Sequence, residues 1–320
     1  MESLINWDIG LEDNSKMKNP KIAIIICTYN QEKLLEICLK SLKEKTNYKN
    51  YKVYLIEDSG RGEIGKRIKR KFKWIDLTIN KKNLGFSGSN NVGIKKSIKE
   101  YNPDYVLLLN DDCEVIDNKW LNKIIEVGEK DKKIGVLGCK IIYPDGSLQN
   151  IGGKIERWKI GSIDSFNEKN ILEVDHVMGA CIIIKKEVIK KIGLLDEVYS
   201  PYLLEDTDYC LRAKEAGFKI VSLPFVKIIH KKGKSIDSLE DKKRLLVRFK
   251  NDIIFSKRHL KGWNKFFRIF IYLPIVAVFK KKNDTDKLKL SKFALRKKFL
   301  RNLYLWLIAF SPRKYNKILK

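Results

Sequence analysis

Two carboxylates follow an apolar run in the first half of the chain. Residues 105–109 read YVLLL, and Asn110, Asp111 and Asp112 come directly after them. A continuous apolar run predicts a strand that is buried on both faces of a parallel sheet. Ligands of open α/β sheets bind beyond the carboxyl ends of the strands, where carboxylate oxygens suit Mg²⁺ or Mn²⁺ and, with them, phosphates. On this segment alone, a polar turn after a core strand is the alternative.

Three earlier strands must help to position these residues. Apolar runs at residues 22–27, 53–56 and 74–79 predict the strands, and polar residues follow each of them. These residues are Thr28, Tyr29 and Asn30, then Glu57 and Asp58, and then residues 80–83. In a doubly wound sheet all four strand ends share one edge, so the clusters predict one site. Glu57 or Asp58 would accept hydrogen bonds from a base or ribose, and the small residues at 85–89 would let the backbone approach a ligand closely.

Helical periodicity separates the strands and indicates the fold class. Residues 31–45 repeat apolar side chains on one helical face, and residues 85–99 become helical after a start rich in Gly, Ser and Asn. This alternation predicts an α/β fold with a mostly parallel central sheet and helices on both faces. Further along, strands are expected at residues 134–143 and 177–184 and a helix at 205–216. Residues 220–225 and 226–229 are expected as two short extended pieces around Pro224.

Several segments, taken in order, resemble the family 2 glycosyltransferases with a GT-A fold, a Rossmann-like architecture. They are IAIIICTYNQEKLLEICLKSL, VYLIEDSG, NKKNLGFSGSNNVGI and YVLLLNDDCEV, followed by YPDGSLQNIGG, VMGACIIIKKEVIKKIGLLDE and YLLEDTDYCLRAKEAGF. The resemblance covers about residues 20–236 and is closest to the rhamnosyltransferase-like and galactofuranosyltransferase-like subgroup. It implies transfer of a sugar from a nucleotide-diphosphate donor, UDP- or dTDP-linked, with inversion and with help from Mg²⁺ or Mn²⁺.

The resemblance also implies which residues contact the donor. They are Thr28, Tyr29, Asn30, Glu57, Asp58, Asn83, Gly85, Asn90, Asn110, Asp111 and Lys234. The family usually has Asp at the second strand end, where this chain has Glu57 with Asp58 beside it, so the residue that holds the base or ribose is left open. Lys234 would meet the leaving diphosphate. A solvated basic loop is the alternative for the segment around Lys234.

A cation site and a catalytic base follow from the same resemblance. Asn110 occupies the first position of the family's DxD motif, so Asp112 is the expected metal ligand and Asp111 is secondary. His230 would bind the metal or face the diphosphate, whereas a lone histidine is otherwise a structural residue. A bound metal would stabilise the negative charge of the departing nucleotide diphosphate.

The acidic pair Glu205 and Asp206 lies at the start of the expected helix at 205–216. In the family the Asp of this pair is the base, so Asp206 would take the proton of the acceptor hydroxyl as that hydroxyl attacks the anomeric carbon. A helix cap that complements the helix dipole is the alternative for the pair. The segments at residues 145–153 and 178–180 are expected to shape the acceptor side.

The charge of the chain is unevenly distributed. Residues 231–320 carry 27 Lys and Arg against 6 Asp and Glu, a net charge of +21, whereas residues 1–230 carry only +6. We therefore expect a leader at 1–19, a GT-A catalytic domain at 20–236 and a basic helical region at 237–320. The six cysteines are scattered without a CxxC pair, which favours reduced core thiols of an intracellular protein. The N-terminal residues lack the apolar stretch of a signal peptide, and no segment has about 20 uninterrupted apolar residues.

Two aromatic-rich apolar runs lie in the basic region, at residues 266–279 and 299–310. Each is too short to span a bilayer and is flanked by lysines and arginines, which suits the surface of an anionic membrane. We expect a peripheral enzyme on the inner face of the cell membrane that acts on a lipid-linked or polysaccharide acceptor. Packing of these runs on the catalytic domain, or on a second subunit of a homo-oligomer, is the alternative.

Two other functions are alternatives to glycosyl transfer. A nucleic-acid-binding protein would use the basic region, but the aromatics there sit inside long aliphatic runs, which favours lipid and argues against a nucleic-acid partner. A nucleotidyltransferase would need a Gly-rich, basic loop soon after the first strand, and residues 28–32, TYNQE, do not provide one.

Overall fold

The computed structural model describes residues 19–157, 159–231, 241–273 and 307. The chain divides into two compact units. Of the described residues, the larger unit comprises 19–154, 161–201 and 205–231, and the smaller comprises 155–157, 159–160, 202–204, 241–273 and 307. The domain boundaries expected from the sequence, at residues 19/20 and 236/237, remain a prediction.

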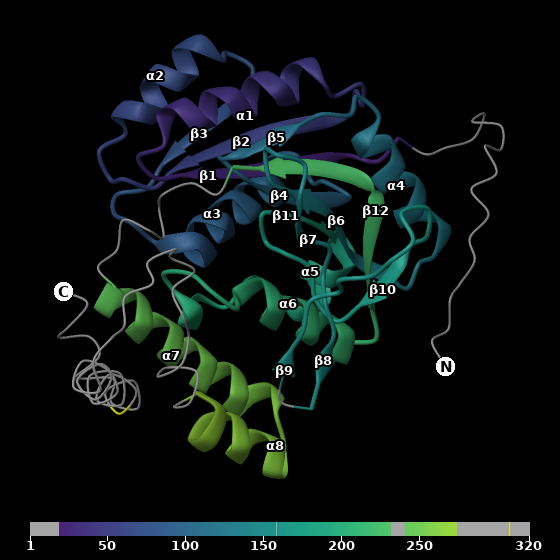
Figure 1. Cartoon of the computed structure of the whole chain (residues 1–320). Helices are drawn as coiled ribbons and strands as arrows, with labels where there is room; N and C mark the ends of the chain where they lie inside the picture. Colours follow the sequence, from purple (N-terminus) through teal and green to yellow (C-terminus); the bar gives the residue numbers. More distant parts are fainter. Residues whose placement is uncertain (1–18, 158, 232–240, 274–306, 308–320) are drawn as a thin grey trace. The chain divides into compact units, whose positions relative to one another are not determined.

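A mixed sheet, ten-stranded within the described residues, forms the centre of the larger unit (Figure 1). Its parallel part contains β1 (Ile22–Thr28), β2 (Tyr51–Glu57), β3 (Asp76–Ile79) and β4 (Tyr105–Asn110). Its other half contains β6 (Ile134–Ile142), β10 (Leu172–Val174), β11 (Cys181–Lys185) and β12 (Lys219–His230). The strand order is β10-β12-β6-β11-β4-β1-β2-β3, and β11 runs antiparallel to both of its neighbours.

Helices cover both faces of this sheet, as the two hydrophobic clusters of the larger unit show. One cluster packs α1 (Glu32–Glu44), α2 (Glu63–Lys71) and α4 (Trp120–Lys130) on the face to which Ile24 and Ile26 point. The other packs α3 (Gly85–Glu100), α5 (Lys186–Ile192) and α6 (Glu205–Glu215) on the face to which Ala23 and Ile25 point. Side chains alternate along a strand, so a strand buried on both faces must be apolar throughout. The predicted fold class is confirmed.

Two short strands pair at the ends of longer ones. Strand β5 (Cys113–Val115) runs antiparallel to the end of β12, and β7 (Leu148–Asn150) runs antiparallel to the end of β6. The sequence predicted neither pairing. The two extended pieces expected around Pro224 were also wrong, because β12 is one strand. Its register against β6 shifts between Leu223 and Lys227, and Pro224, which has no N–H to donate, lies in this irregular part.

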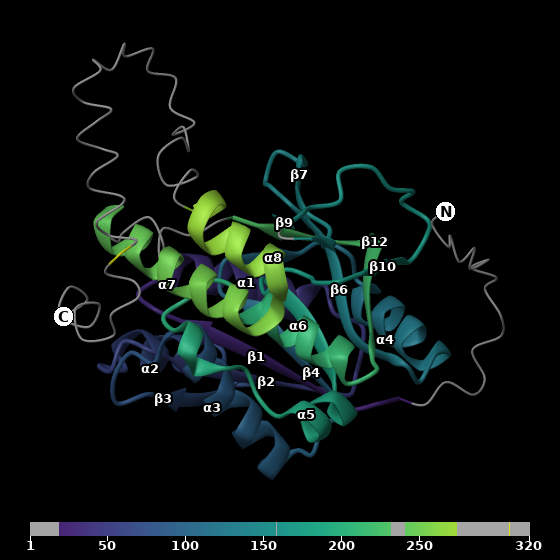
Figure 2. The same ribbon diagram turned by 90° about the horizontal axis from the view of Figure 1, so that it is seen from below.

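The smaller unit contains α7 (Asp241–His259), α8 (Gly262–Phe267) and the π-helical turn η2 (Arg268–Tyr272), with the hairpin of β8 (Ile155–Glu156) and β9 (Lys159–Ile160). Figure 2 shows α8 beside α7. Arg268 and Asp252 form a buried ion pair of 2.7 Å that joins η2 to α7. Two apolar runs were expected at a membrane. Of the run at 266–279, the structure describes residues 266–273, and of the run at 299–310 it describes residue 307 alone. The rest of both runs lies outside the described residues. None of the described helices combines the length and the hydropathy needed to cross a bilayer.

Candidate active site

The polar ends of β1, β2 and β4 meet at one edge of the sheet, as the sequence predicted. Because these strands are parallel and in register, Thr28 lies opposite Glu57 and Cys27 lies opposite Asn110. Thr28 and Glu57 are buried, whereas the next residues along the chain, Tyr29 and Asn30, are exposed. The edge thus presents a partly buried polar surface of the kind at which α/β proteins bind ligands.

A compact group of metal-ligating side chains forms where β5 meets β12. Asp112, Cys113 and His230 each place one ligand atom within 4.8 Å of the others, and all three residues are buried. Asp112 Oδ1 lies 3.1 Å from His230 Nε2, and Asn110 Nδ2 lies 3.4 Å from the same nitrogen. Burial raises the pKa of the Cys113 thiol well above its ordinary value, and this thiol donates to the carbonyl of Ala180. The carboxylate and the imidazole are therefore the natural ligands for a cation here.

Gln149 is a member of this group that the sequence did not single out. Its Oε1 lies 2.7 Å from His230 Nδ1, on the side of the ring opposite to Asp112. Residue 149 was expected only as part of the segment 145–153 at the acceptor side. No spacing rule connects residue 149 to residue 230, because their proximity depends on β6 lying between β7 and β12.

Asp111, the other acidic residue of this strand end, is also buried. Burial raises the pKa of Asp111 to about 7, opposed in part by the Thr28 side chain and reinforced by the negative charge of Asp112. A carboxyl group that resists ionisation is a weak ligand for a cation. The secondary role of Asp111 remains a prediction.

At the second strand end, Asp58 organises the loop that leads into α3. Its carboxylate accepts hydrogen bonds from the backbone N–H groups of Leu84 (2.9 Å) and Gly85 (3.1 Å) and from Asn80 Nδ2 (2.7 Å). Asn83 Oδ1 also accepts from the Gly85 N–H, at 2.8 Å. The Asp58 carboxylate is therefore engaged in holding the first residues of α3 in place.

Glu57 beside it is fully buried and less occupied. Its Oε1 accepts from the backbone N–H of Ser59 at 3.3 Å, and its Oε2 makes no hydrogen bond within the described residues. The two carboxylates of this strand end therefore differ in what they can offer a ligand. Glu57 has an oxygen to spare, whereas Asp58 is engaged in backbone contacts.

Other expected donor contacts have structural partners of their own. Gly85 has a φ of 72°, and a Cβ there would lie 2.6 Å from Ser200 Oγ and 2.8 Å from the carbonyl oxygen of Pro201. Glycine is thus required for the approach of the chain's own backbone at residues 200–201. Asn90 is buried and donates to the Phe86 carbonyl. Lys234 lies outside the described residues.

The candidate base, Asp206, is held from two sides at the start of α6. Its Oδ2 accepts from the backbone N–H of Gly179 at 2.7 Å, and its Oδ1 accepts from the N–H of Thr207 at 2.6 Å. A Cβ on Gly179 would come within 3.2 Å of that Oδ2, so a glycine lets the two segments lie this close. The carboxylate is therefore fixed in position rather than extended into solvent.

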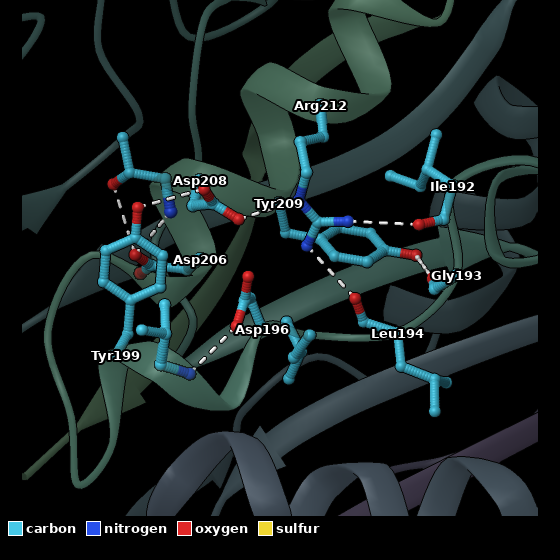
Figure 3. A network of polar contacts seen from close by, with 12 residues as sticks. Ile192, Gly193, Leu194, Asp196, Tyr199, Asp206, Asp208, Tyr209 and Arg212 are labelled. Carbon is cyan, nitrogen blue, oxygen red and sulfur yellow. Dashed lines mark hydrogen bonds and ion pairs between the residues drawn. The ribbon is translucent and has the colours of Figure 1, made fainter. Parts of the chain in front are cut away.

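A buried polar network fixes the first two turns of α6 (Figure 3). Asp208, with no exposed surface, accepts from Tyr199 Oη at 3.0 Å and from Arg212 Nε at 2.8 Å. Arg212 in turn donates to the carbonyls of Ile192 and Leu194, at 3.2 and 3.1 Å. Asp208 and Arg212 are one helical turn apart, which places both on one face of the helix. The sequence shows the i, i+4 spacing of these two residues, but it does not show that their side chains point into the protein.

The residues that lead into α6 are also held by side-chain contacts. Leu203 and Leu204 have φ values of 83° and 74°, a conformation that L-residues adopt at a cost. The buried Asn251 of α7 donates to the carbonyls of Tyr202 and Leu203, at 2.7 and 2.9 Å. These two bonds help to maintain the strained backbone immediately before the acidic pair.

Residues 179 and 180 connect the candidate base to the cation group. The Gly179 N–H binds Asp206, whereas the Ala180 carbonyl accepts from the backbone N–H of Asn110 at 3.0 Å. A fixed carboxylate and a carboxylate–imidazole pair therefore lie on either side of one short backbone segment. Such a pairing can combine proton removal from a hydroxyl with stabilisation of a departing phosphate.

We compared the chain with protein families and with known proteins. The chain is 26% identical over 231 residues to the O-antigen biosynthesis protein RfbC of Myxococcus xanthus, covering 66% of the chain and 17% of RfbC. It is 28% identical over 179 residues to the low-salt glycan biosynthesis hexosyltransferase Agl10 of Haloferax volcanii, covering 54% of the chain and 57% of Agl10. The chain thus spans less than two thirds of either relative.

Among solved structures, the fold is similar to that of GalNAc-T7 with UDP, GalNAc and Mn²⁺. The TM-score is 0.60 at 16% identity, over 92% of this chain and 58% of the other. The family model described as glycosyl transferase family 2 matches residues 23–193, more than half of the chain. The chain therefore belongs to glycosyl transferase family 2.

Proposed function

We propose that this protein is an inverting glycosyltransferase that moves a sugar from a nucleotide-diphosphate donor, UDP- or dTDP-linked, to a hydroxyl group of a lipid-linked or polysaccharide acceptor. The observation that carries the proposal is the pairing of a fixed carboxylate, Asp206, with the Asp112–His230 group across residues 179–180. Family membership and the glycan-related relatives support the reaction class.

The donor would lie along the polar strand ends, from Thr28 and Glu57 to Asn110. The Oε2 of Glu57 has hydrogen-bonding capacity to spare, whereas the Asp58 carboxylate is engaged, so we assign the base or ribose contact to Glu57. Asp58 would act indirectly, because it holds the loop of Asn83 and Gly85 against which the donor rests.

A divalent cation, Mg²⁺ or Mn²⁺, fits the residues at the end of β12. Asp112 and His230 offer an oxygen and a nitrogen 3.1 Å apart in a buried setting, and the carboxylate is a ligand of the kind that Mg²⁺ and Mn²⁺ prefer. When bound there, the cation would neutralise charge that develops on the donor's diphosphate. The remaining chemistry belongs to side chains of the protein.

In the transfer step, Asp206 accepts the proton of the acceptor hydroxyl while the acceptor oxygen bonds to the anomeric carbon. The bond from that carbon to the diphosphate oxygen breaks, and the nucleotide diphosphate leaves with the electron pair. Attack opposite to the leaving group inverts the anomeric configuration. The hydrogen bonds from Gly179 and Thr207 keep the carboxylate in one orientation, which reduces the entropy cost of reaching the transition state.

The proposal is tested by replacing the base. A panel of UDP- and dTDP-sugars with Mn²⁺ is first screened for thermal stabilisation, which identifies the donor by mass action. Turnover of that donor by Asp206→Asn should then fall by about 10² to 10⁴ relative to the unmodified protein. Asp196→Asn is a matched control, since Asp196 caps a neighbouring 3₁₀ turn and an amide can replace it. Undiminished turnover of Asp206→Asn would remove Asp206 as the base.

We also propose that the protein binds the inner face of the cell membrane through α8 and η2. Trp263, Phe266 and Phe270 are 69%, 46% and 49% exposed, and their rings contact one another at centroid distances of 5.2 and 5.1 Å. These three residues form an aromatic ridge within a region of net charge +21. Exposed aromatics beside basic residues suit the interface of an anionic leaflet.

Vesicle co-sedimentation tests the aromatic ridge. The unmodified protein should bind vesicles of phosphatidylcholine with phosphatidylglycerol and bind pure phosphatidylcholine weakly. Replacing Trp263, Phe266 and Phe270 together by Ser should abolish most of this binding. Ile37→Ser is the control, because Ile37 is an exposed apolar residue on another helix. Equal binding of the triple variant and the control would exclude the ridge as the membrane contact.

A further inference from the structure

We propose that Gln149 is a positioning residue for the cation site, because it determines which nitrogen of His230 faces Asp112. The inference rests on the proposed function, which assigns a cation to Asp112 and His230. Gln149 Oε1 contacts His230 Nδ1, the ring nitrogen on the side away from Asp112. Its role would be to set the ring in the state that a cation requires.

The hydrogen bond from His230 to Gln149 fixes the position of the ring proton. An amide oxygen can only accept, and Gln149 Oε1 lies 2.7 Å from His230 Nδ1, so Nδ1 must donate. In the neutral imidazole the other nitrogen, Nε2, then carries a lone pair. That lone pair is directed to the side of the ring on which Asp112 lies.

This state places two electron-rich atoms against each other. His230 Nε2 and Asp112 Oδ1 are 3.1 Å apart, and both side chains are 7% exposed. With a neutral imidazole facing an ionised carboxylate, neither of these two atoms carries a proton to share. Asn110 Nδ2, at 3.4 Å, is a distant donor to Nε2. A shared cation would turn this repulsion into attraction. Metal-bound histidines typically use their second nitrogen in this way, with an acceptor that fixes ring and tautomer.

The strand that carries Gln149 is shaped to direct this side chain. In the pairing of β7 with β6, Leu148 lies opposite Ile142 and Asn150 lies opposite Ile141, so Gln149 is an extra residue in the ladder. An extra residue of this kind, a β-bulge, turns a side chain away from the regular alternation and is frequent beside active sites. Because β6 also pairs with β12 up to Ile229, the bulge lies close to His230.

The experiment compares Gln149→Leu, which removes the acceptor, with Gln149→Glu, which keeps an acceptor oxygen. ¹⁵N-edited NMR of the metal-free protein reports the tautomer of each histidine, and the chain has only three. Electron paramagnetic resonance of free Mn²⁺ measures cation affinity. Gln31→Leu is the matched control, being the same change at the other glutamine of the chain. Circular dichroism melts confirm that each variant folds.

We expect the Nδ1–H tautomer of His230 in the unmodified protein, its loss in Gln149→Leu and its recovery in Gln149→Glu. Mn²⁺ affinity should fall by about 10- to 100-fold in Gln149→Leu, as for other residues that orient metal ligands. An unchanged tautomer, or an affinity within twofold of the unmodified protein, would overturn the inference. If instead the unmodified protein binds no Mn²⁺ and turns over the donor equally in EDTA, the cation part of the proposed function fails, and the NMR result alone decides what Gln149 does.

Discussion

Replacing Asp208 by Ala should destabilise the protein by about 3 kcal/mol. Asp208 has no exposed surface and pairs with Arg212, whose side chain is 21% exposed. Removing one partner of a buried ion pair costs about 3–5 kcal/mol, because the other charge stays behind. In the variant, Arg212 still donates hydrogen bonds to the carbonyls of Ile192 and Leu194 and still contacts solvent. Its charge is therefore partly compensated, and we expect a cost at the lower end of this range.

Replacing Asp208 should also displace the candidate base, because Asp206 lies on the same turn of α6. A displacement of that carboxylate by about 1 Å would reduce turnover by about 10²-fold. Tyr199→Phe is the graded control, since it removes only one hydrogen bond to Asp208 and should cost about 1 kcal/mol. Urea unfolding gives the free energies, and donor turnover gives the activity.

A double-mutant cycle isolates the ion pair from the rest of the network. Asp208→Leu, Arg212→Met and the double variant should show a coupling energy of about 1–3 kcal/mol, so that the double variant is more stable than the sum of the single effects predicts. The reasoning is refuted if Asp208→Ala costs less than about 1 kcal/mol. An additive cycle would refute it equally, since the two residues would then not act as a pair.

Two further predictions concern Gly179 and Asp76. Gly179→Ala places a methyl within 3.2 Å of Asp206 Oδ2, so turnover should fall by about 10-fold or more with little change in stability; equal loss of both would point to misfolding instead. Partial burial raises the pKa of Asp76, but hydrogen bonds from Lys96 and Lys52 outweigh it and hold the pKa below its usual value. Because the pKa of Asp76 is lower in the folded than in the unfolded state, the ionised carboxylate stabilises the fold above a pH of about 4. This stabilisation is lost as the pH falls through the folded-state pKa. The stability gap between the unmodified protein and Asp76→Asn, at most about 1 kcal/mol at pH 7, should therefore narrow towards pH 3, and a gap independent of pH would contradict this assignment.

The strand ends could be predicted from the sequence because their signal is local. An apolar run such as residues 105–109 marks a buried strand, and parallel strands must bring their carboxyl ends to one edge. Asn110 and Asp112 were therefore assigned to one site without knowledge of any contact. His230 depended on the family resemblance, because nothing within its own segment distinguishes a ligand from a structural histidine.

The supporting residues could not be predicted in this way. The contact of Gln149 with His230 depends on a bulge in β7, and that of Gly179 with Asp206 depends on how α6 crosses the sheet. Asp208 and Arg212 have helical spacing, but an exposed ion pair would have the same spacing. The proposed assignment of the donor contact to Glu57 rests on a contact that the sequence does not show, because the N–H groups of residues 84 and 85 bind Asp58. These are consequences of three-dimensional packing between distant segments.

The irregular part of β12 bears on how the length of the chain can vary between relatives. Before it, Leu223 lies opposite Cys139, and after it Lys227 lies opposite Lys140, so residues 224–226 have no counterpart on β6. The register is set anew beyond this point by pairing with β6 and β5, up to His230 opposite Cys113. A change in the number of residues within 224–226 would leave the pairing beyond Lys227 in register, because these residues pair with nothing on β6. One extra residue between Lys227 and His230 would reverse the alternation and turn the imidazole to the other face of the sheet. The irregular part of β12 thus separates the register of the first half of the strand from that of the half that directs His230.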